Sequence, residues 1–527
     1  MSAGDQDRLH QGATLGHLFA RAAARFAERD ALVAGDLRLT YARLADRVGA
    51  MAAVMRRAGV PQGAAIAILS HNRPDVLVAY LAAVVEGWRL TPLAAMSSVE
   101  DQVFILNDAA IDVLVIDAAL ADRVAPLRGG APRLAHVFAL GACEAAPDLT
   151  AATDAEPRAL LEVKPRRSDV AAVYYTGGTT GRPKGVAHTH DSAMAASMMA
   201  ASEWEWPQDL RMLATTPISH AAGAFAWPVF MKGGALHILE TFSPEAFGRY
   251  VAREKITMTF LVPTQIYRLL DSPDIEDRGD AEDRSLVSLE TVVYGAAPIS
   301  PSRLADALRR FGPIFMQLYG QTEAPNCISY LSKAEHRIDD PESLGSCGVP
   351  LGAVQVELLD AEGGTVATDG IGEICVRGAF VMQGYWNRAQ ETAQAFEAGW
   401  LHTGDMGRFD ARGRLHIVDR CKDMIISGGF NVYPSEVEAV LALEPGVAAC
   451  AVVGLPDPTW GEVVVAAVVA LPGLSLDVDA LRQRVRERKG PVQAPKHVIL
   501  AERLPITAIG KIDKKALRLE LVSKIQG

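Results

Sequence analysis

Residues 174–185 read Tyr174-Tyr175-Thr176-Gly177-Gly178-Thr179-Thr180-Gly181-Arg182-Pro183-Lys184-Gly185, and they connect a β-branched and aromatic run to a helical region. The glycines permit close backbone approach and positive φ, the threonines offer hydroxyl donors, and Lys184 supplies a cation. Such a loop can wrap a polyphosphate. It is not a Walker A loop, because no Gly-Lys-Ser/Thr stands at the required spacing. The alternative is a surface loop without a ligand, but the density of these residue types favours binding.

The chain around this loop alternates helical and strand patterns, which is typical of an α/β fold with a largely parallel sheet. Residues 15–26 carry apolar side chains at helical spacing, and a second helix is expected after Thr40, a plausible N-cap. Short apolar runs indicate buried strands at residues 64–69, 113–116, 171–175, 257–262, 289–294 and 314–318.

Near Gly345 the pattern changes to short strands separated by Gly- and Asp-rich turns, which indicates a small β-barrel-like subdomain. After residue 420 the chain is long enough for one more domain, with both helical and strand patterns. We therefore predict an N-terminal domain over residues 1–420 and a smaller α+β C-terminal domain over residues 421–527. The N-terminal domain is expected to consist of two α/β parts, about 1–180 and 181–345, and a β part, 346–420.

Composition excludes several classes of function. The 527 residues include 63 acidic and 52 basic ones, a net charge of −11, so no general field attracts nucleic acid. No apolar run reaches the roughly eighteen residues that a membrane span requires, and the start of the chain lacks the apolar core of a secretory signal. The six cysteines are scattered, which favours reduced thiols over a zinc or redox site. We expect a cytoplasmic protein.

Four further motifs follow the loop in the sequence. They are Gly295-Ala296-Ala297-Pro298, Tyr319-Gly320-Gln321-Thr322-Glu323, His402-Thr403-Gly404-Asp405, and a C-terminal segment that ends in Gly510-Lys511. Each is weak alone, since Asp after Gly is usually a turn residue and terminal lysines are generally solvated.

In this order the motifs resemble those of the adenylate-forming superfamily, which includes acyl- and aryl-CoA synthetases, peptide-synthetase adenylation domains and beetle luciferases. The loop is similar to the family pattern Y-T-S-G-T-T-G-x-P-K-G, with Gly177 in place of Ser. The motifs span residues 174–511, and the resemblance covers essentially the whole chain. It implies a mobile C-terminal domain.

The resemblance implies that ATP binds with Mg²⁺ held by Glu323, a hard oxygen ligand. It places Tyr319 on adenine and gives Asp405 and Arg420 the ribose, since a carboxylate suits a vicinal diol. The catalytic residues that it implies are Lys511, Thr322, Glu323, His220 and Lys184. The residues that it implies for ATP and AMP are Thr176, Gly177, Gly178, Thr179, Thr180, Gly181, Lys184, Gly295, Ala296, Ala297, Pro298, Gln317, Tyr319, Gly320, Thr322, Asp405 and Arg420.

The resemblance also implies two half-reactions. A carboxylate attacks the α-phosphate of ATP and pyrophosphate leaves, and a thiol then attacks the acyl-adenylate. Rotation of the C-terminal domain about Lys422 would exchange the groups near the carbonyl. Gly428 and Gly429 would then leave room for pantetheine, with Trp460 and Lys496 near the CoA nucleotide.

His220 matches a gate beside the acyl site, although a lone His is more often a core residue. An apolar acyl pocket is expected from His220, Ala221, Ala222, Gly223, Ala224, Phe225 and Ala296. The acid itself stays open between aliphatic, alicyclic and aromatic classes.

The leading hypothesis is an AMP-forming acid–CoA ligase with ATP, Mg²⁺ and CoA as its small molecules, and a homodimer is compatible with it. The segment Val492-Gln493-Ala494-Pro495-Lys496 lacks an aromatic residue and a base that many relatives have there. The alternative is therefore a stand-alone adenylating enzyme that loads a carrier protein. A non-catalytic nucleotide sensor is a third hypothesis, which Glu323, Asp405 and Lys511 argue against.

Overall fold

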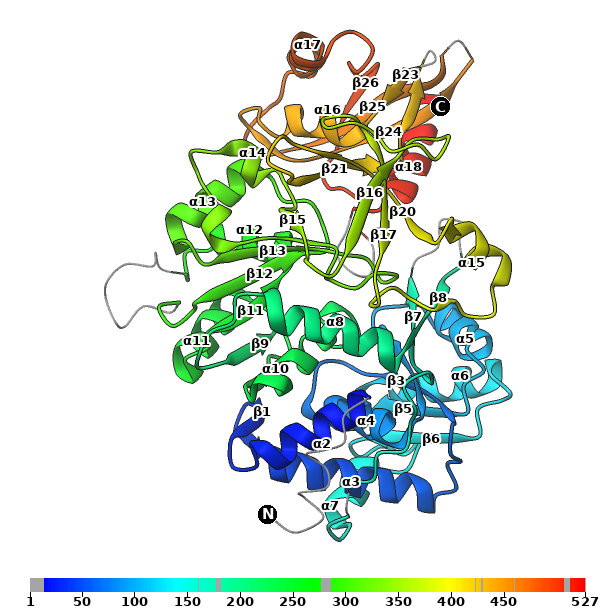
Figure 1. The fold of residues 1–527 in the computed structure, drawn as a ribbon. Helices are drawn as coiled ribbons and strands as arrows, with labels where there is room; N and C mark the ends of the chain where they lie inside the picture. The colour runs from blue at the N-terminus through cyan, green and yellow to red at the C-terminus, as the bar shows by residue number, and fades with distance from the viewer. Residues whose placement is uncertain are drawn as a thin grey trace.

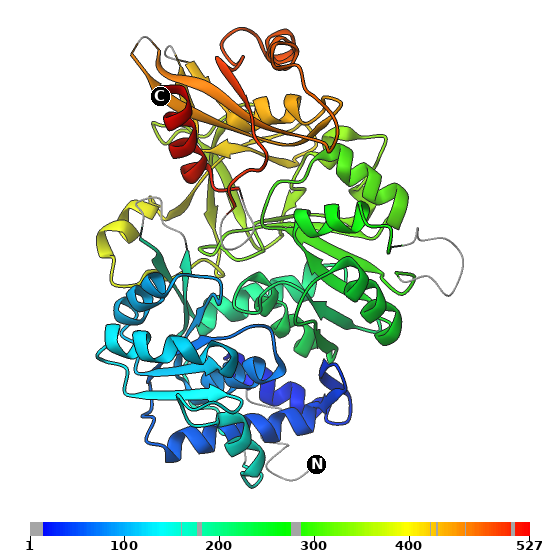
Figure 2. The same cartoon turned by 180° about the vertical axis from the view of Figure 1, so that it is seen from behind.

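The computed structural model describes residues 14–159, 161–176, 182–275, 286–421, 423–427, 430–458, 460–506 and 512–526. They form a mixed α/β structure with a large N-terminal domain and a small C-terminal domain at the end of the molecule opposite the N-terminus (Figure 1, Figure 2). The predicted fold class is confirmed. None of the helices described combines the length and the apolar character needed to cross a membrane.

The first sheet has seven strands, with a parallel core and two antiparallel strands at one edge. In sheet order they are β18 (Gly384–Tyr385), β8 (Lys184–Thr189), β7 (Val170–Thr176), β4 (Arg89–Leu93), β3 (Ala65–Leu69), β5 (Val113–Asp117) and β6 (His136–Leu140). The helices of this part are α2 (Leu15–Arg25), α3 (Tyr41–Arg57), α4 (Pro74–Glu86), α5 (Val99–Asp108), η1 (Ala118–Arg123), α6 (Val124–Gly130) and α7 (Leu149–Ala155).

The second sheet has nine strands. In sheet order they are β15 (Val349–Pro350), β14 (Ser329–Leu331), β13 (Phe315–Tyr319), β12 (Thr291–Gly295), β11 (Met258–Leu261), β9 (Arg211–Ala214), β10 (Ala235–Ile238), β1 (Asp30–Ala34) and β2 (Leu37–Thr40). Its helices are α8 (His190–Glu203), α9 (Ala221–Ala224), α10 (Ala226–Lys232), α11 (Pro244–Glu254), α12 (Pro263–Leu270), α13 (Pro301–Phe311), η2 (Lys333–Glu335) and α14 (Pro341–Leu344).

Two smaller sheets complete the fold. The third contains β16 (Gln355–Leu359), β17 (Gly372–Arg377), β20 (Trp400–Phe409), β19 (Phe396–Glu397) and β21 (Leu415–Arg420), with α15 (Ala389–Ala395) beside it. The fourth contains β23 (Phe430–Val432), β22 (Ile425–Ser427), β25 (Gly461–Ala470), β24 (Val447–Asp457) and β26 (His497–Leu500). Its helices are α16 (Pro434–Leu441), α17 (Val478–Lys489) and α18 (Lys514–Gln526).

The first two sheets share one hydrophobic core, and helices α2, α4, α8 and α10 lie between them (Figure 1). The predicted cap of α3 is confirmed, because the Thr40 hydroxyl accepts a hydrogen bond from the Arg43 N–H at 3.3 Å. The strands cross the boundaries expected at residues 180 and 345. β1 and β2 join the second sheet, while β18 returns from residue 384 to pair with β8 in the first.

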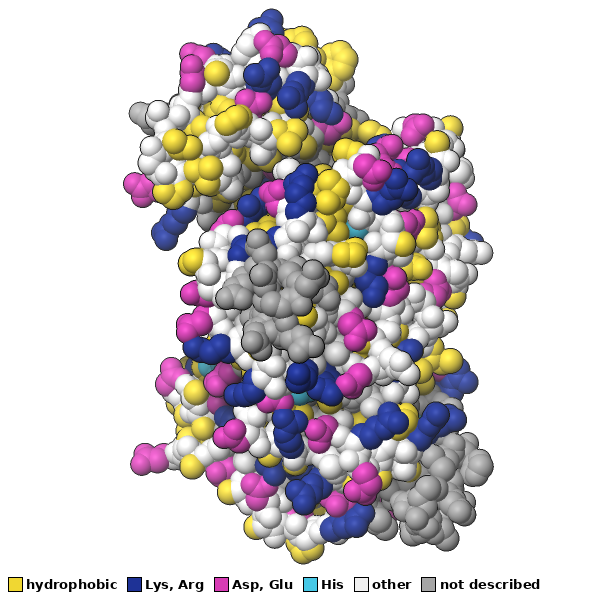
Figure 3. All heavy atoms as spheres, turned by 90° about the vertical axis from the view of Figure 1, so that its left-hand side faces the viewer, with side chains coloured by type: hydrophobic (Ala, Val, Ile, Leu, Met, Phe, Trp, Pro, Cys, Tyr) yellow, Lys and Arg dark blue, Asp and Glu magenta, His cyan; other side chains and the backbone are white. Residues whose placement is uncertain are grey.

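Charges of both signs are interspersed on the face drawn in Figure 3, and hydrophobic side chains gather on its upper, C-terminal part. The exposed apolar residues of that domain include Leu443, Leu471 and Leu474. Because acidic side chains lie among the basic ones, the described residues on this face form no continuous basic stripe (Figure 3).

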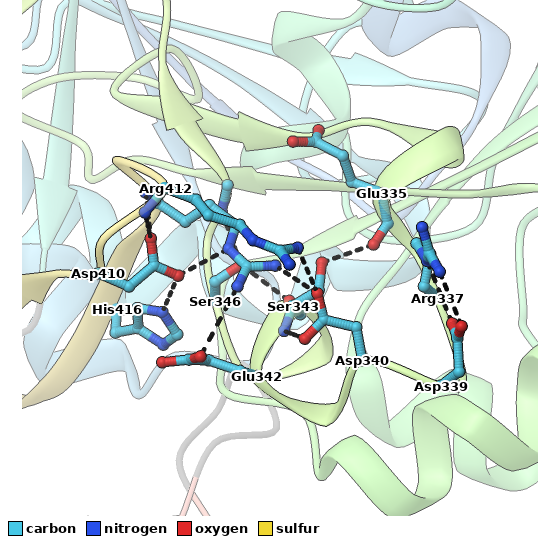
Figure 4. A network of polar contacts seen from close by, with 12 residues as sticks. Glu335, Arg337, Asp339, Asp340, Glu342, Ser343, Ser346, Asp410, Arg412 and His416 are labelled. Atoms are coloured by element: carbon cyan, nitrogen blue, oxygen red, sulfur yellow. Dashed lines mark hydrogen bonds and ion pairs between the residues drawn. The ribbon is translucent and has the colours of Figure 1, made fainter.

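A buried ion network fixes the β20–β21 hairpin to α14 (Figure 4). Asp410 accepts hydrogen bonds from the backbone N–H groups of Arg412 and Arg414, both at 2.9 Å, and from Arg414 Nε at 2.7 Å. Arg414 Nη1 lies 3.0 Å from a carboxylate oxygen of Asp340. Burial raises the pKa of Asp410, but the hydrogen bonds from Arg414 and His416 outweigh it and hold that pKa well below its usual range. The turn of the hairpin is thereby anchored.

We expect Arg414→Met to lower the free energy of unfolding by roughly 3–5 kcal/mol, because it leaves the Asp410 carboxylate buried without its cation. Urea unfolding followed by circular dichroism measures this. Arg412→Met is the control, since 70% of the Arg412 side chain is exposed, and its change should stay below about 1 kcal/mol. Equal losses in the two variants would contradict the role given to Arg414.

Candidate active site

Three of the sequence motifs, 295–298, 319–323 and 402–405, meet at one edge of the second sheet. The parallel strands β12 and β13 are neighbours, and they end at Gly295 and Tyr319, where two of the motifs begin. Ligands of open α/β sheets bind outside the carboxyl ends of the strands. A Cβ at Gly320 would lie 2.2 Å from the backbone nitrogen of Asn326, so only glycine fits this turn. The edge therefore holds a tightly folded backbone where a ligand is expected.

Asp405 is the centre of the first cluster of side chains. Its Oδ2 accepts hydrogen bonds from the Tyr319 hydroxyl at 2.8 Å and from Gln321 Nε2 at 2.6 Å. Its Oδ1 lies 3.2 Å from Arg420 Nε, and Asp405 and Arg420 are paired residues of β20 and β21. Burial, and then the Asp405 carboxylate, raise the pKa of Tyr319, which keeps its hydroxyl a donor. Motif residues separated by about a hundred positions are thus in direct contact.

Glu323 is the centre of a second cluster, whose other side chains come from the paired strands β8 and β18. The Tyr385 hydroxyl donates to Glu323 Oε1 at 2.9 Å, and Lys184 Nζ lies 5.1 Å from the centroid of the Tyr385 ring. Burial, and then the Glu323 carboxylate, raise the pKa of Tyr385, so that it stays protonated. His188 on β8 donates through Nε2 to the carbonyl oxygen of Thr322 at 2.7 Å.

The phosphate loop proposed from the sequence connects β7 to β8. Thr176 and Lys184 are paired residues at the ends of these strands. Lys184 in turn lies beside Tyr385. Both ends of the loop are therefore next to the Glu323 cluster. Its central residues, Gly177, Gly178, Thr179, Thr180 and Gly181, lie outside the described residues.

The segment expected to form the acyl pocket divides into two groups. Ala222 and Phe225 are buried in the core, and the Phe225 ring packs against those of Trp204 and Phe260. A Cβ at Gly223 would lie 2.2 Å from the carbonyl oxygen of Ile218, so this glycine is explained by packing. Ala221, Ala224 and Ala296 are not buried. His220 Nδ1 lies 2.8 Å from the Ser219 hydroxyl, at the start of α9.

Ala296 and Gln317, both expected to contact the nucleotide, are constrained by the backbone and by a hydrogen bond, respectively. Ala296 adopts a φ of 66°, a left-handed conformation that is costly for a residue with a Cβ. Gln317 is buried, and its Oε1 accepts a hydrogen bond from the Tyr294 hydroxyl at 3.2 Å. The contact of Gln317 with adenine stays a prediction.

The C-terminal domain brings Lys496 and Trp460 together. Lys496 Nζ lies 4.8 Å from the centroid of the Trp460 ring, and the tryptophan is 46% exposed. Gln493, which stands where many relatives have a base, donates to Glu436 at 3.0 Å. Lys422, Gly428, Gly429 and Lys511 lie outside the described residues.

Sequence reasoning missed Tyr385, Gln321 and His188. Tyr385 lies in a Gly-Tyr-Trp segment without a distinctive pattern, and Gln321 occupies the variable position of its motif.

A cavity of about 950 Å³ lies away from the motifs. It is at the edge where β9, β10 and β11 begin, among charged residues that include Arg29, Arg211 and Glu254, and none of the motif residues lines it.

Comparison with known families identifies the family of this chain. A model described as AMP-binding enzyme matches residues 19–386, and one described as AMP-binding enzyme C-terminal domain matches residues 436–511. The chain belongs to the AMP-binding enzyme family. Membership confirms the resemblance to the adenylate-forming superfamily that the motifs carry.

Curated relatives of this AMP-binding enzyme match nearly its full length. It is 43% identical over 518 residues to the medium/long-chain-fatty-acid–CoA ligase FadD8 of Mycobacterium tuberculosis (strain ATCC 25618 / H37Rv), covering 95% of this chain and 89% of the relative. It is 38% identical over 486 residues to a feruloyl-CoA synthase of Amycolatopsis sp, covering 92% of this chain and 94% of the relative.

Solved structures of the family match the whole fold. ATP-bound MatB from Rhodopseudomonas palustris matches with a TM-score of 0.88 at 28% identity, covering 98% of this chain and 100% of that chain. The amide bond synthetase McbA from Marinactinospora thermotolerans matches with a TM-score of 0.88 at 34% identity, covering 96% of this chain and 99% of that chain.

Proposed function

We propose that this enzyme is an AMP-forming acid–CoA ligase. It activates a carboxylic acid with ATP to an acyl-adenylate, releases pyrophosphate, and transfers the acyl group to CoA to give acyl-CoA and AMP. The observation that carries the proposal is the convergence of two clusters beside the β7–β8 connection. Asp405 with Tyr319 and Arg420 forms one cluster, and Glu323 with Tyr385 forms the other.

The Asp405 cluster suits a nucleoside. A carboxylate has about four acceptor sites on its two oxygens, and three of those of Asp405 are engaged by Tyr319, Gln321 and Arg420. Arg420 is about half exposed, so it can move as a diol approaches. We assign the ribose hydroxyls to Asp405 and Arg420, and adenine to the segment 295–298 with Tyr319.

The Glu323 cluster suits Mg²⁺ and the phosphates. Mg²⁺ takes hard oxygen ligands, and among the described residues no donor occupies Oε2 of Glu323. The donor set therefore fits the ion, with Glu323 as its protein ligand. When bound, Mg²⁺ neutralises charge on the phosphate oxygens. Lys184 and the loop 176–181 hold the phosphates, while Tyr385 orients the Glu323 carboxylate.

Tyr385→Phe removes the hydrogen bond that fixes the Glu323 carboxylate. We expect the Mg²⁺ concentration for half-maximal pyrophosphate release to rise roughly three- to tenfold, the range for losing part of a hydrogen bond to a charged group. Titration of MgCl₂ at fixed ATP measures it. Tyr330→Phe on β14 is the matched control, and an unchanged Mg²⁺ requirement in Tyr385→Phe would refute the role of Tyr385.

The carboxylate must approach the α-phosphate in line while negative charge is neutralised, so adenylation depends mainly on positioning and on cations. We assign this work to Thr322, Lys184 and Lys511, with His220 as a gate beside the acyl group. The half-reaction with CoA needs different groups. We propose that the C-terminal domain, starting at residue 421, turns about Lys422 between the two steps and brings Gly428 and Gly429 to the pantetheine channel.

Lys511→Ala separates the two half-reactions. We expect acyl-adenylate formation to fall by about 100-fold or more, while transfer from preformed acyl-adenylate to CoA changes by less than about fivefold. Single-turnover assays of each step measure this. Lys515→Ala, an exposed lysine on α18, should change neither step, and an equal loss of both steps in Lys511→Ala would contradict the assignment.

The acid is proposed to be apolar. The acyl-side residues that are not buried are Ala221, Gly223, Ala224 and Ala296, together with His220. An amino-acid substrate would need an acidic partner for its ammonium group. FadD8 is named for medium- and long-chain fatty acids and the Amycolatopsis relative for a feruloyl group. A panel of fatty and aryl acids, scored by pyrophosphate release, distinguishes these classes.

CoA is the proposed acceptor, because Lys496 and Trp460 together present a cation and an aromatic face to its nucleotide. The alternative is loading of a carrier protein, which the engagement of Gln493 with Glu436 favours, since this removes one candidate contact for CoA. The cytoplasmic location and a homodimer also stay proposals.

Free CoA should therefore yield a thioester. We expect Lys496→Ala to raise KM for CoA roughly three- to tenfold, by losing a charged contact to phosphate, while KM for ATP stays unchanged. Thioester formation followed by mass spectrometry, with CoA and with a pantetheinylated carrier protein, tests both acceptors. Thioester on the carrier and never on CoA would replace the leading proposal by its alternative.

A further inference from the structure

Strand β20 bulges beside Asp405. In its pairing with β17, Glu373 faces Met406 and Cys375 faces His402. One residue of β17 therefore spans the same length as residues 403–405 of β20. Such an insertion leaves backbone N–H groups without a ladder partner, and it re-aims the side chains that it carries. Asp405 is the last residue of this bulge, so the bulge sets its direction.

The carboxylate of Glu373 closes the bulge from the neighbouring strand. Its Oε1 accepts a hydrogen bond from the backbone N–H of Gly404 at 2.8 Å, and its Oε2 accepts one from His402 Nδ1 at 2.8 Å. Gly404 has a φ of 71°, the left-handed conformation that favours glycine. The two residues that flank Thr403 are therefore held by one side chain of β17.

Thr403 completes the same arrangement. Its hydroxyl donates to the Ile374 carbonyl oxygen at 2.7 Å and accepts from the Asp405 N–H at 3.1 Å. Atoms of Glu373, Cys375 and His402 also lie within 4.8 Å of one another, as metal ligands do. Both oxygens of Glu373 already accept hydrogen bonds, however, so the bulge explains this cluster without an ion.

We infer that Glu373 is a positioning residue for the nucleotide, acting through the bulge that presents Asp405. The inference rests on the proposed role of Asp405 at the ribose. Without an acceptor at residue 373, the Gly404 N–H has lost its partner and the bulge relaxes, which turns the Asp405 carboxylate away from the diol. The effect should therefore concern ATP and leave the acid and CoA unaffected.

The test compares ATP with 2′-deoxy-ATP. Wild-type enzyme should prefer ATP in kcat/KM by roughly tenfold or more, the worth of a hydrogen bond to a charged group. Glu373→Met, which keeps the size of the side chain without an acceptor, should reduce this preference to less than about threefold. It should also raise KM for ATP about tenfold, with kcat and KM for the acid nearly unchanged.

Two further variants sharpen the test. Glu373→Gln retains a carbonyl acceptor for Gly404 and should restore most of the preference for ATP. Glu397→Gln, an exposed carboxylate on β19 of the same sheet, should behave as wild type. If Glu373→Met does not fold, Glu373→Asp takes its place, because its shorter carboxylate cannot reach both partners and should lose the preference too.

The possible outcomes distinguish the ribose role of Asp405 from the positioning role of Glu373. A wild-type enzyme that uses ATP and 2′-deoxy-ATP equally would refute the ribose role of Asp405. The positioning role of Glu373 alone would be overturned if the wild-type enzyme prefers ATP and Glu373→Met or Glu373→Asp keeps this preference. A loss of kcat with unchanged discrimination would also overturn it.

Discussion

The buried carboxylate of Asp405 is the interaction on which the arrangement of the site depends. Asp405 is only 5% exposed, and a buried charge is tolerated only when donors surround it. The donors come from the end of β13, through Tyr319 and Gln321, and from β21, through Arg420. The requirement to satisfy this carboxylate therefore joins the Asp410–Arg414–Asp340 network in holding the small third sheet against the large second sheet.

The same principle links β7 and β8, which flank the proposed phosphate loop, to the Glu323 carboxylate. Strand β8 continues from the loop, and β18 pairs with it after nearly two hundred residues. Through this pair, His188 holds the carbonyl of Thr322 and Tyr385 holds the carboxylate of Glu323. Burial lowers the pKa of His188, so that its ring stays neutral. A shift of β8 or β18 would therefore also displace Thr322 and the Glu323 carboxylate.

Local pattern predicted the parts of this site that depend on short stretches of sequence. The strands ending at Gly295 and Tyr319 and the motif residue Asp405 follow from such patterns. Tyr385 and Glu373 could not be predicted, because their importance arises from register between strands distant in sequence. The addition of β1 and β2 to the second sheet was missed for the same reason, since pairing with β10 joins residues about two hundred positions apart.

The contacts across the proposed hinge are weak enough to permit rotation. Before Lys422, Asp419 accepts a hydrogen bond from the Ser435 N–H at 2.9 Å, and the Ser435 hydroxyl donates to the Val418 carbonyl. The N–H groups of Asp423 and Met424 also donate to the Arg420 carbonyl oxygen, at 3.0 and 3.1 Å. A turn about residue 422 would break bonds of this kind, at a net cost of about 1 kcal/mol each. Arg420 lies two residues before the proposed hinge and is bound to Asp405. It would therefore stay with the N-terminal domain during the rotation. The end of β21 is therefore anchored to β20, while the hydrogen bonds that join it to the C-terminal domain are individually weak, which suits the rotation that we propose between the two half-reactions.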